Sequence, residues 1–295
     1  PTWDAAKCIQ CNQCAYCCPH ATIRPFALTE EEAAKAPAAA KIVDVKAGKG
    51  KGVYKFTMAI SPLDCMGCGV CVGACPVNAL TMVAQEGELP QQDVFDYCVA
   101  DVAEKKDMQD NTVKGSQFKQ PMLEFSGSCA GCAETSYARL ITQLFGDRMY
   151  ISNATGCSSI WGGTASISPY TVNKDSGHGP AWCNSLFEDN AEHGLGLYIG
   201  QKTIRENLIK EIAEVAGSDK ASAELKAAYE KFIATKNNTK ANDEPAKALI
   251  AELEKAAAAG CEKSAEILKS KQYIAKKSVW IFGGDGWAYD IGFGG

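Results

Sequence analysis

Two cysteine runs carry the clearest chemical signal in this sequence of 295 residues. Both runs read Cys-x2-Cys-x2-Cys-x3-Cys-Pro, from Cys8 to Pro19 and again from Cys65 to Pro76. This spacing is typical of chains that hold two 4Fe-4S clusters, in which the fourth cysteine of each run binds the cluster of the other run. The two predicted ligand sets are Cys8, Cys11, Cys14 and Cys75 for one cluster, and Cys65, Cys68, Cys71 and Cys18 for the other.

The loops that carry these cysteines must be tight, because three thiolates within seven residues bind three corners of one cube. Gly67, Gly69 and Asn12 suit such loops, since they accept positive φ angles and let backbone amides turn toward the sulfides. Pro19 and Pro76 are expected to end the two loops and to let the chain leave the clusters.

A zinc site or a set of disulfides is the alternative interpretation, because both also use Cys-x2-Cys pairs. A zinc site needs four ligands, usually as two separated pairs. Here a third cysteine, a fourth cysteine and a proline recur in both runs, which favours the clusters. Cys17 stands outside the pattern of its run, and we interpret it as a packed thiol.

The elements that position the two runs are expected to form an α+β, two-cluster ferredoxin-like domain over residues 1–86, with an insertion over residues 26–61. In this insertion Thr29 and Glu32 match a capping box that opens a short helix, and residues 53–58 alternate like a strand. The segment between helix and strand is basic because of Lys46, Lys49, Lys51 and Lys55. This lysine loop suits the docking of an acidic electron carrier, and an ordinary solvated hairpin loop is the simpler interpretation.

A second domain of α/β type is expected over residues 121–295, after a polar linker over residues 87–120. It contains a predicted strand at residues 149–152, a helical insertion over residues 201–277 and an apolar strand at residues 278–282. The insertion carries apolar residues at helical spacing, so its charged residues are interpreted as solvated helix faces. Chemistry in this domain is therefore expected near its start and at its end.

Cys129 and Cys132 precede a predicted amphipathic helix, and Cys157 follows the strand at residues 149–152 in a glycine-rich turn. These three cysteines leave a 4Fe-4S cube one ligand short. The fourth ligand is either Cys183 or a cysteine outside this sequence. A redox-active Cys-x2-Cys pair, as in thioredoxin-like proteins, is the alternative.

At the end of the chain, Gly284, Asp285 and Gly286 follow the strand at residues 278–282. Glycines in such a turn let the backbone approach a diphosphate, and an aspartate offers an oxygen ligand to Mg²⁺. The motif fits a thiamine diphosphate site, although any strand-to-helix turn can carry it.

Composition narrows the setting of this chemistry. Fifteen cysteines, most of them at cluster spacing, and no visible targeting segment indicate a reducing compartment, expected to be the cytoplasm of an anaerobe or microaerophile. We expect no membrane span, because no run of about 18 apolar residues occurs, and a net charge of −5 argues against nucleic acid as a partner. Because the sequence starts at Pro1 and stops after a glycine-rich motif, we interpret it as a piece of a longer polypeptide.

Taken together, these motifs resemble pyruvate:ferredoxin (flavodoxin) oxidoreductase, in the carboxyl-terminal part that carries its two-cluster ferredoxin domain and the start of its thiamine diphosphate domain. The resemblance covers nearly the whole chain. It rests on the two cysteine runs, on residues 127–137, 153–161 and 185–192, and on the final Gly-Asp-Gly motif.

The resemblance implies a third 4Fe-4S cluster held by Cys129, Cys132 and Cys157, with its fourth cysteine outside this sequence. It also implies contacts to thiamine diphosphate from Glu134, Cys157, Gly284, Asp285, Gly286 and Trp287, with Asp285 on the Mg²⁺ ion. No catalytic residue is assigned within this chain, because the residues that activate the cofactor and bind pyruvate are expected in the missing domains.

The implied activity is the oxidative decarboxylation of pyruvate with coenzyme A to acetyl-CoA and CO2, with electrons passed through three clusters to ferredoxin or flavodoxin. The implied partners are these carriers, the missing domains and a second copy in a homodimer. An indolepyruvate or 2-oxoglutarate oxidoreductase is an alternative, because substrate-selecting residues lie outside this chain. A ferredoxin-type electron carrier fused to an unrelated α/β domain is another, but it does not explain why the cysteine trio and the Gly-Asp-Gly motif occur together.

Overall fold

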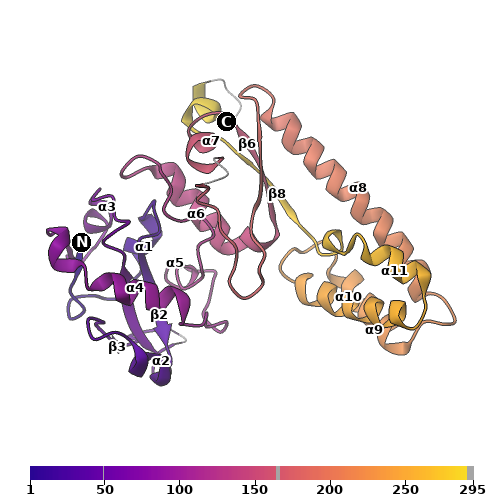
Figure 1. The fold of residues 1–295 in the computed structure, drawn as a ribbon, viewed down its shortest axis with the longest axis horizontal. Coiled ribbons are helices and arrows are strands. Elements are labelled where there is room, and N and C mark those ends of the chain that lie inside the picture. Colours follow the sequence, from indigo (N-terminus) through magenta and orange to yellow (C-terminus); the bar gives the residue numbers. More distant parts are fainter. Residues whose placement is uncertain (49, 164–166, 291–295) are drawn as a thin grey trace. The chain divides into compact units, whose positions relative to one another are not determined.

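The computed structural model describes residues 1–48, 50–163 and 167–290 and consists of two compact units (Figure 1). The first unit comprises Pro1–Asp147 and Ser159–Pro180, and the second comprises Arg148–Ser158 and Ala181–Gly295. The sequence predicts a boundary within residues 87–120 instead. The division lies later because the helices that follow this segment pack with the amino-terminal residues. No helix within the described ranges is both long and apolar enough to cross a membrane.

An internal repeat organises the amino-terminal part of the first unit. The second cysteine run follows the first at an offset of 57 positions (8 to 65), and helix α3 (Val70–Gly73) follows helix α1 (Gln13–Cys17) at the same offset. Three pairs of equivalent residues share positive φ angles, namely Gln10 (59°) with Gly67 (69°), Asn12 (61°) with Gly69 (74°), and Ala21 (55°) with Asn78 (49°). The expected left-handed turns at Gly67, Gly69 and Asn12 are confirmed, and Gln10 adopts one without being a glycine.

Two small antiparallel sheets complete this part of the unit. Strand β1 (Thr2–Trp3) pairs with β5 (Leu80–Thr81), and β2 (Ile23–Leu28), β4 (Lys55–Ile60) and β3 (Val43–Asp44) form a sheet in the order β2-β4-β3. After β2, helix α2 (Glu30–Lys35) begins at the predicted capping box, which is confirmed. Thr29 Oγ1 accepts a hydrogen bond from the Glu32 amide at 3.2 Å, and the Thr29 amide donates to the Glu32 carboxylate at 2.7 Å.

Residues 87–120, for which the sequence predicts a linker, contain two helices, and the first of them packs on this sheet. A 3-10 helix η1 (Gln85–Glu88) leads into α4 (Gln91–Ala100), and α5 (Val113–Ser116) follows. Val94, Phe95 and Cys98 of α4 are buried in one hydrophobic cluster with Leu28 and Ala59 of the sheet. Three apolar residues on one face are enough for this contact, so the polar composition of the segment does not reveal it.

Helix α6 (Ala133–Phe145) is the amphipathic helix predicted after Cys132, and it is confirmed. Its buried face carries Thr135, Ala138, Arg139, Thr142 and Gln143, so most of the groups that it buries are polar. A short 3-10 turn η2 (Gly146–Arg148) follows. The first unit therefore contains a buried polar layer, where the sequence suggests an ordinary apolar helix face.

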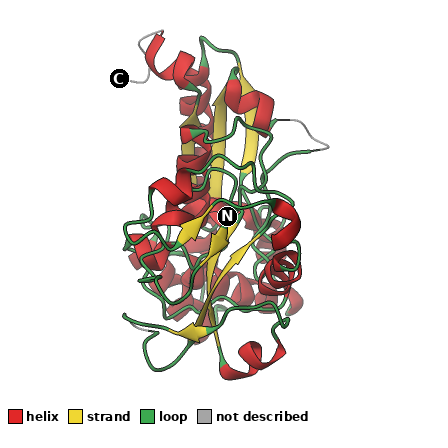
Figure 2. Cartoon of the chain, turned by 90° about the vertical axis from the view of Figure 1, so that its left-hand side faces the viewer, coloured by secondary structure: helices red, strands yellow, loops and turns green. Residues whose placement is uncertain are grey.

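The second unit is built on a parallel sheet in which β6 (Met149–Ala154) lies between β7 (Ala181–Ser185) and β8 (Ser278–Phe282). Figure 2 draws the strands of the chain in yellow. Asn153 of β6 is aligned with Asn184 of β7 and Phe282 of β8, so the three strands end at the same edge. The strand predicted at residues 278–282 is confirmed with these bounds. Helix α7 (Cys157–Gly162) begins after β6, and a π-helical turn η4 (Gly286–Asp290) follows β8.

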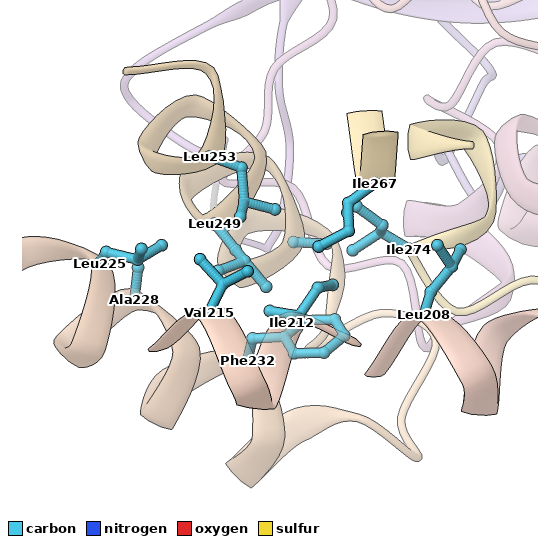
Figure 3. Close-up of a cluster of buried hydrophobic side chains, with 11 residues drawn as sticks. Leu208, Ile212, Val215, Leu225, Ala228, Phe232, Leu249, Leu253, Ile267 and Ile274 are labelled. Carbon is cyan, nitrogen blue, oxygen red and sulfur yellow. The ribbon is translucent and has the colours of Figure 1, made fainter. Parts of the chain in front are cut away.

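A helical group occupies the chain between β7 and β8. Its elements are α8 (Asn190–Ala216), α9 (Ala223–Thr235), α10 (Asp243–Ala258), α11 (Glu262–Leu268) and the 3-10 turn η3 (Lys271–Tyr273). Figure 3 shows the hydrophobic core of these helices, in which Ile212, Phe232 and Leu249 are fully buried. The predicted helical spacing of apolar residues in this insertion is confirmed, although one of them, Ile204, is 40% exposed.

Candidate metal centres

The first predicted ligand set lines a single cavity in the first unit. Its four cysteines come from the first run and from the end of the second run, and they are Cys8, Cys11, Cys14 and Cys75. Trp3 and Asn12 also line this cavity. Trp3 Nε1 and Asn12 Oδ1 are buried and have no hydrogen-bond partner among the described residues. Four thiols and two unsatisfied polar atoms around one cavity fit a bound polar group.

The second ligand set lines another cavity in the same unit. Its four cysteines are Cys18, Cys65, Cys68 and Cys71. His20 belongs to the same lining, and its Nδ1 lies 3.2 Å from the Ser126 carbonyl oxygen. A carbonyl only accepts, so Nδ1 carries the hydrogen, and Nε2 is left buried without a partner in the described chain. Burial lowers the pKa of His20 and so favours the neutral ring.

The two cavities exchange their fourth cysteines. Cys75 leaves the second run to line the first cavity, and Cys18 leaves the first run to line the second. Cys17 lines neither cavity. Its Sγ lies 3.4 Å from the Cys14 carbonyl oxygen, and burial raises its pKa to about 11. This geometry suits a packed, protonated thiol at Cys17.

Burial also controls the protonation of the thiols in the cavities. It raises the pKa of Cys14 well above its ordinary value and the pKa of Cys71 to about 12, and the neighbouring thiolates act in the same direction. Thiolates therefore need positive charge from a bound metal to form at these positions. Backbone amides of Gln10 and Ala79 point at Cys8 Sγ (3.3 Å) and Cys75 Sγ (3.2 Å), as expected for hydrogen bonds to ligating sulfur.

Within residues 1–48, 50–163 and 167–290, no three His, Cys, Asp or Glu side chains converge on a single-ion site. A cubane instead holds each thiolate on a separate iron corner.

The third cysteine trio is divided between the two units. Cys129 and Cys132 lie before α6 in the first unit, and Cys157 begins α7 in the second. Cys129 and Cys157 are exposed, and Cys132 is half-buried. Gly131 (φ 78°) brings the first two close to the second cavity, since a Cβ built on it would lie 3.6 Å from Cys68 Cβ.

The predicted thiamine diphosphate residues of the second unit gather at one edge of its sheet. Cys157 follows β6, Gly284 to Trp287 follow β8, and these parallel strands are neighbours. Open α/β sheets bind ligands outside the carboxyl ends of their strands, so this edge fits a cofactor. Asp285 is exposed there, whereas Gly284 is buried. The remaining predicted contact, Glu134, lies in the first turn of α6 in the first unit.

Trp287 closes over the start of this turn. A Cβ built on Gly283 would lie 2.5 Å from Trp287 Cε3, so only glycine leaves room for the indole ring. Trp287 Nε1 is buried without a hydrogen-bond partner within the described chain. An unsatisfied donor at this edge fits a ligand that brings acceptor oxygens.

The lysine loop lies against the first cysteine run. Lys46 Nζ donates to the Cys8 carbonyl oxygen, the Lys46 amide donates to Gln10 Oε1 at 2.8 Å, and Gln10 Nε2 donates to the Asp44 carbonyl oxygen at 2.8 Å. Lys114 joins it, because its Nζ donates to the Ala47 carbonyl oxygen at 2.8 Å. Lys49, which the sequence places in this loop, lies outside the described residues.

Two cysteines of the first cavity also act on the protonation of Lys114. Burial lowers the pKa of Lys114, and the charges of Cys11 and Cys8 oppose that shift. The lysine loop and Lys114 therefore place positive charge beside the first cavity. The sequence does not predict that Lys114 lies beside the first cavity. This position depends on a contact between distant residues, in which Asn12 Nδ2 donates to the Lys114 carbonyl oxygen at 2.8 Å.

Comparisons with known proteins first define the class. Residues 7–79 match the family model of the 4Fe-4S dicluster domain. This range contains both cysteine runs, so the amino-terminal part of the chain is a ferredoxin-type 4Fe-4S domain.

The particular relatives extend the similarity to the whole chain. Pyruvate-flavodoxin oxidoreductase of Klebsiella pneumoniae is 48% identical over 297 residues, covering 100% of this chain and 25% of the relative. Pyruvate:ferredoxin oxidoreductase of Moorella thermoacetica is 48% identical over 303 residues, covering 100% and 26%. Pyruvate dehydrogenase [NADP(+)] of Cryptosporidium parvum is 43% identical, covering 100% and 17%. The resemblance to pyruvate:ferredoxin (flavodoxin) oxidoreductase is thus confirmed, and the chain spans about a quarter of the length of the first two relatives.

Proposed function

We propose that this chain is the electron-transfer segment of a 2-oxoacid:ferredoxin oxidoreductase that converts pyruvate and coenzyme A to acetyl-CoA and CO2. Electrons leave through three 4Fe-4S clusters to ferredoxin or flavodoxin in a reducing compartment such as the cytoplasm. The observation that carries the proposal is the exchange of fourth cysteines between the two cavities, in a chain similar throughout to such enzymes. The remaining domains of the polypeptide supply the residues that bind pyruvate, and the working enzyme is a homodimer.

The first unit holds two of the clusters. Cys8, Cys11, Cys14 and Cys75 hold the first cluster, and Cys18, Cys65, Cys68 and Cys71 hold the second. A 4Fe-4S cluster accepts and releases one electron at a time. The chain's own contribution is to enclose each cluster, to donate amide hydrogen bonds to its sulfur ligands and to fix the order of the clusters.

Two contacts within the first unit support the order that we propose. The Cys129–Cys132 loop lies against Cys68 through Gly131, which supports a third cluster, bound in part by this loop, next to the second. Lys46 and Lys114 lie beside the first cavity, so the first cluster is the one next to a basic surface. Electrons then pass from the third cluster to the second, from the second to the first, and from there to an acidic carrier.

The edge of the parallel sheet binds the organic cofactor in this proposal. Thiamine diphosphate supplies the carbanion chemistry of decarboxylation when it is bound. Asp285 binds the Mg²⁺ ion, the backbone of Gly284 and Gly286 approaches the diphosphate, and Trp287 donates its indole N–H. Glu134 and Cys157 complete the contacts from this chain. The position of Cys157 after β6 lets one turn serve both the cofactor and the third cluster.

Turnover by the full-length enzyme tests the proposal. With coenzyme A and ferredoxin, pyruvate is expected to be oxidised faster than indolepyruvate and 2-oxoglutarate, and the reduced carrier is expected to appear with each acetyl-CoA. Preference for another 2-oxo acid would keep the protein in the class of 2-oxoacid:ferredoxin oxidoreductases but change its proposed substrate. Ferredoxin-type clusters without turnover of any 2-oxo acid would instead identify an electron carrier fused to an α/β domain.

A further inference from the structure

Arg139 is buried beside the second cavity, and none of its hydrogen-bond partners among the described residues is negatively charged. Its side chain is 2% exposed. Nε donates to the Cys18 carbonyl oxygen at 3.0 Å and Nη2 to the Tyr16 carbonyl oxygen at 2.6 Å, while Nη1 donates to the side-chain oxygens of Gln117 (2.8 Å) and Gln143 (2.9 Å). The four oxygen atoms that accept these hydrogen bonds, all from described residues, belong to neutral groups.

A buried cation without a counter-charge is costly, because burial removes it from water and nothing nearby repays that loss. The guanidinium of an arginine stays protonated at neutral pH, so Arg139 keeps its positive charge in this position. A stable fold therefore calls for negative charge close to this guanidinium.

A nearby arginine shows the contrast. Arg24 is also buried, but its guanidinium forms an ion pair with Glu124, so its charge is offset within the fold. The positive charges beside the first cavity differ in burial, because Lys46 is exposed and Lys114 is half-buried. At Cys75, which corresponds to Cys18 in the repeat, the carbonyl oxygen accepts from the Asn78 amide at 3.3 Å. Among the described residues, a fully buried positive charge therefore lies beside the second cavity and not beside the first.

We propose that Arg139 is a positioning and tuning residue that raises the reduction potential of the cluster held by Cys18, Cys65, Cys68 and Cys71. This inference rests on the proposed function, because it requires the cluster. Four thiolates around a cubane give the cluster a net negative charge, and reduction adds one more. A fixed buried cation stabilises the reduced form more than the oxidised form, and burial keeps water and salt from screening it. The same guanidinium fixes the backbone of Tyr16 and Cys18, which orients one of the four ligands.

The test is a redox titration of the full-length enzyme, followed by electron paramagnetic resonance of each cluster. In Arg139→Gln, the potential of one cluster is expected to become more negative while the others stay in place. Arg139→Lys keeps the charge with fewer hydrogen bonds and is expected to titrate close to the wild type. Arg205→Gln removes a partly buried arginine of the helical group and is expected to change no potential.

A second variant leaves the guanidinium in place. Gln117→Glu puts a carboxylate where an amide oxygen accepts from Arg139, and it is expected to lower the same potential as Arg139→Gln. If Arg139→Gln does not assemble its clusters, the potential measured in Gln117→Glu tests the inference instead. Intact clusters with unchanged potentials in the charge variants would overturn the inference, as would equal shifts in Arg139→Lys and Arg139→Gln. A wild-type enzyme without 4Fe-4S signals would contradict the proposed function itself.

Discussion

Gln10 and Gly67 occupy equivalent positions in the two cysteine runs and share a left-handed backbone, with φ angles of 59° and 69°. The shared conformation turns both loops around their cavities. A side chain in this left-handed region is strained, and the hydrogen bonds of the Gln10 side chain offset that strain. It is 1% exposed and makes two hydrogen bonds to the lysine loop.

Because the two positions share this conformation, glycine is expected to be more stable than alanine at both of them. Gln10→Ala and Gln10→Gly both lose the two hydrogen bonds, but the glycine variant also loses the left-handed strain. It is expected to be more stable than the alanine variant by about 1 kcal/mol. Gly67→Ala is expected to cost about 1 kcal/mol from strain alone, because no atom lies within 4 Å of the added Cβ. Denaturation of the cluster-loaded enzyme measures both, and equal stability of the two variants at residue 10 would contradict the shared conformation.

The exchange of fourth cysteines predicts which thiols hold iron. Cys75→Ser is expected to disrupt the first cluster and to lower the iron content by up to about four atoms per chain, since a cubane holds four irons. Cys17→Ser is the matched control from the same region, because Cys17 lines neither cavity, and it is expected to keep the full iron content. Iron analysis of anaerobically purified full-length enzyme measures both variants. Loss of iron in the control, with Cys75→Ser unchanged, would reverse the assignment.

At the edge of the parallel sheet, Asp285→Ala is expected to abolish retention of thiamine diphosphate and Mg²⁺, because in the proposed function Asp285 supplies an oxygen ligand to the ion. The clusters of the first unit are expected to stay intact, since Asp285 belongs to the second unit. Cofactor and metal content after gel filtration measure the effect. Asp219→Ala, at an exposed position after α8, is the control. Normal cofactor content in Asp285→Ala would mean that the aspartate only caps the turn.

Local spacing was enough to predict several features of this chain. The cysteine pattern predicts both sets of four residues that line the cavities, and Thr29 with Glu32 predicts a helix start. What the sequence does not contain is the burial of polar groups by distant contacts. Arg139 reads as one charge on an amphipathic helix, and only the packing of α6 against residues 16–18 makes it a buried cation. The packing of Val94, Phe95 and Cys98 is missed for the same reason, because it depends on a sheet that lies far away in the sequence.

Charge next to the first cavity predicts how electrons leave the enzyme. Lys51 is exposed in the lysine loop. Lys46 of the same loop contacts Cys8, and Lys114 next to the loop contacts Asn12. Lys51→Glu is therefore expected to slow the reduction of an acidic ferredoxin roughly threefold at low ionic strength, because a rim charge acts mainly on association. The difference is expected to shrink as salt screens the charge, and reduction of a small neutral dye is expected to stay unchanged. Lys226→Glu, at an exposed position of α9 in the other unit, is expected to leave both rates unchanged. Stopped-flow measurement of both acceptors over a range of salt decides the matter: an unaffected ferredoxin rate would place the docking surface elsewhere, and an equal loss with both acceptors would indicate damage to the first cluster.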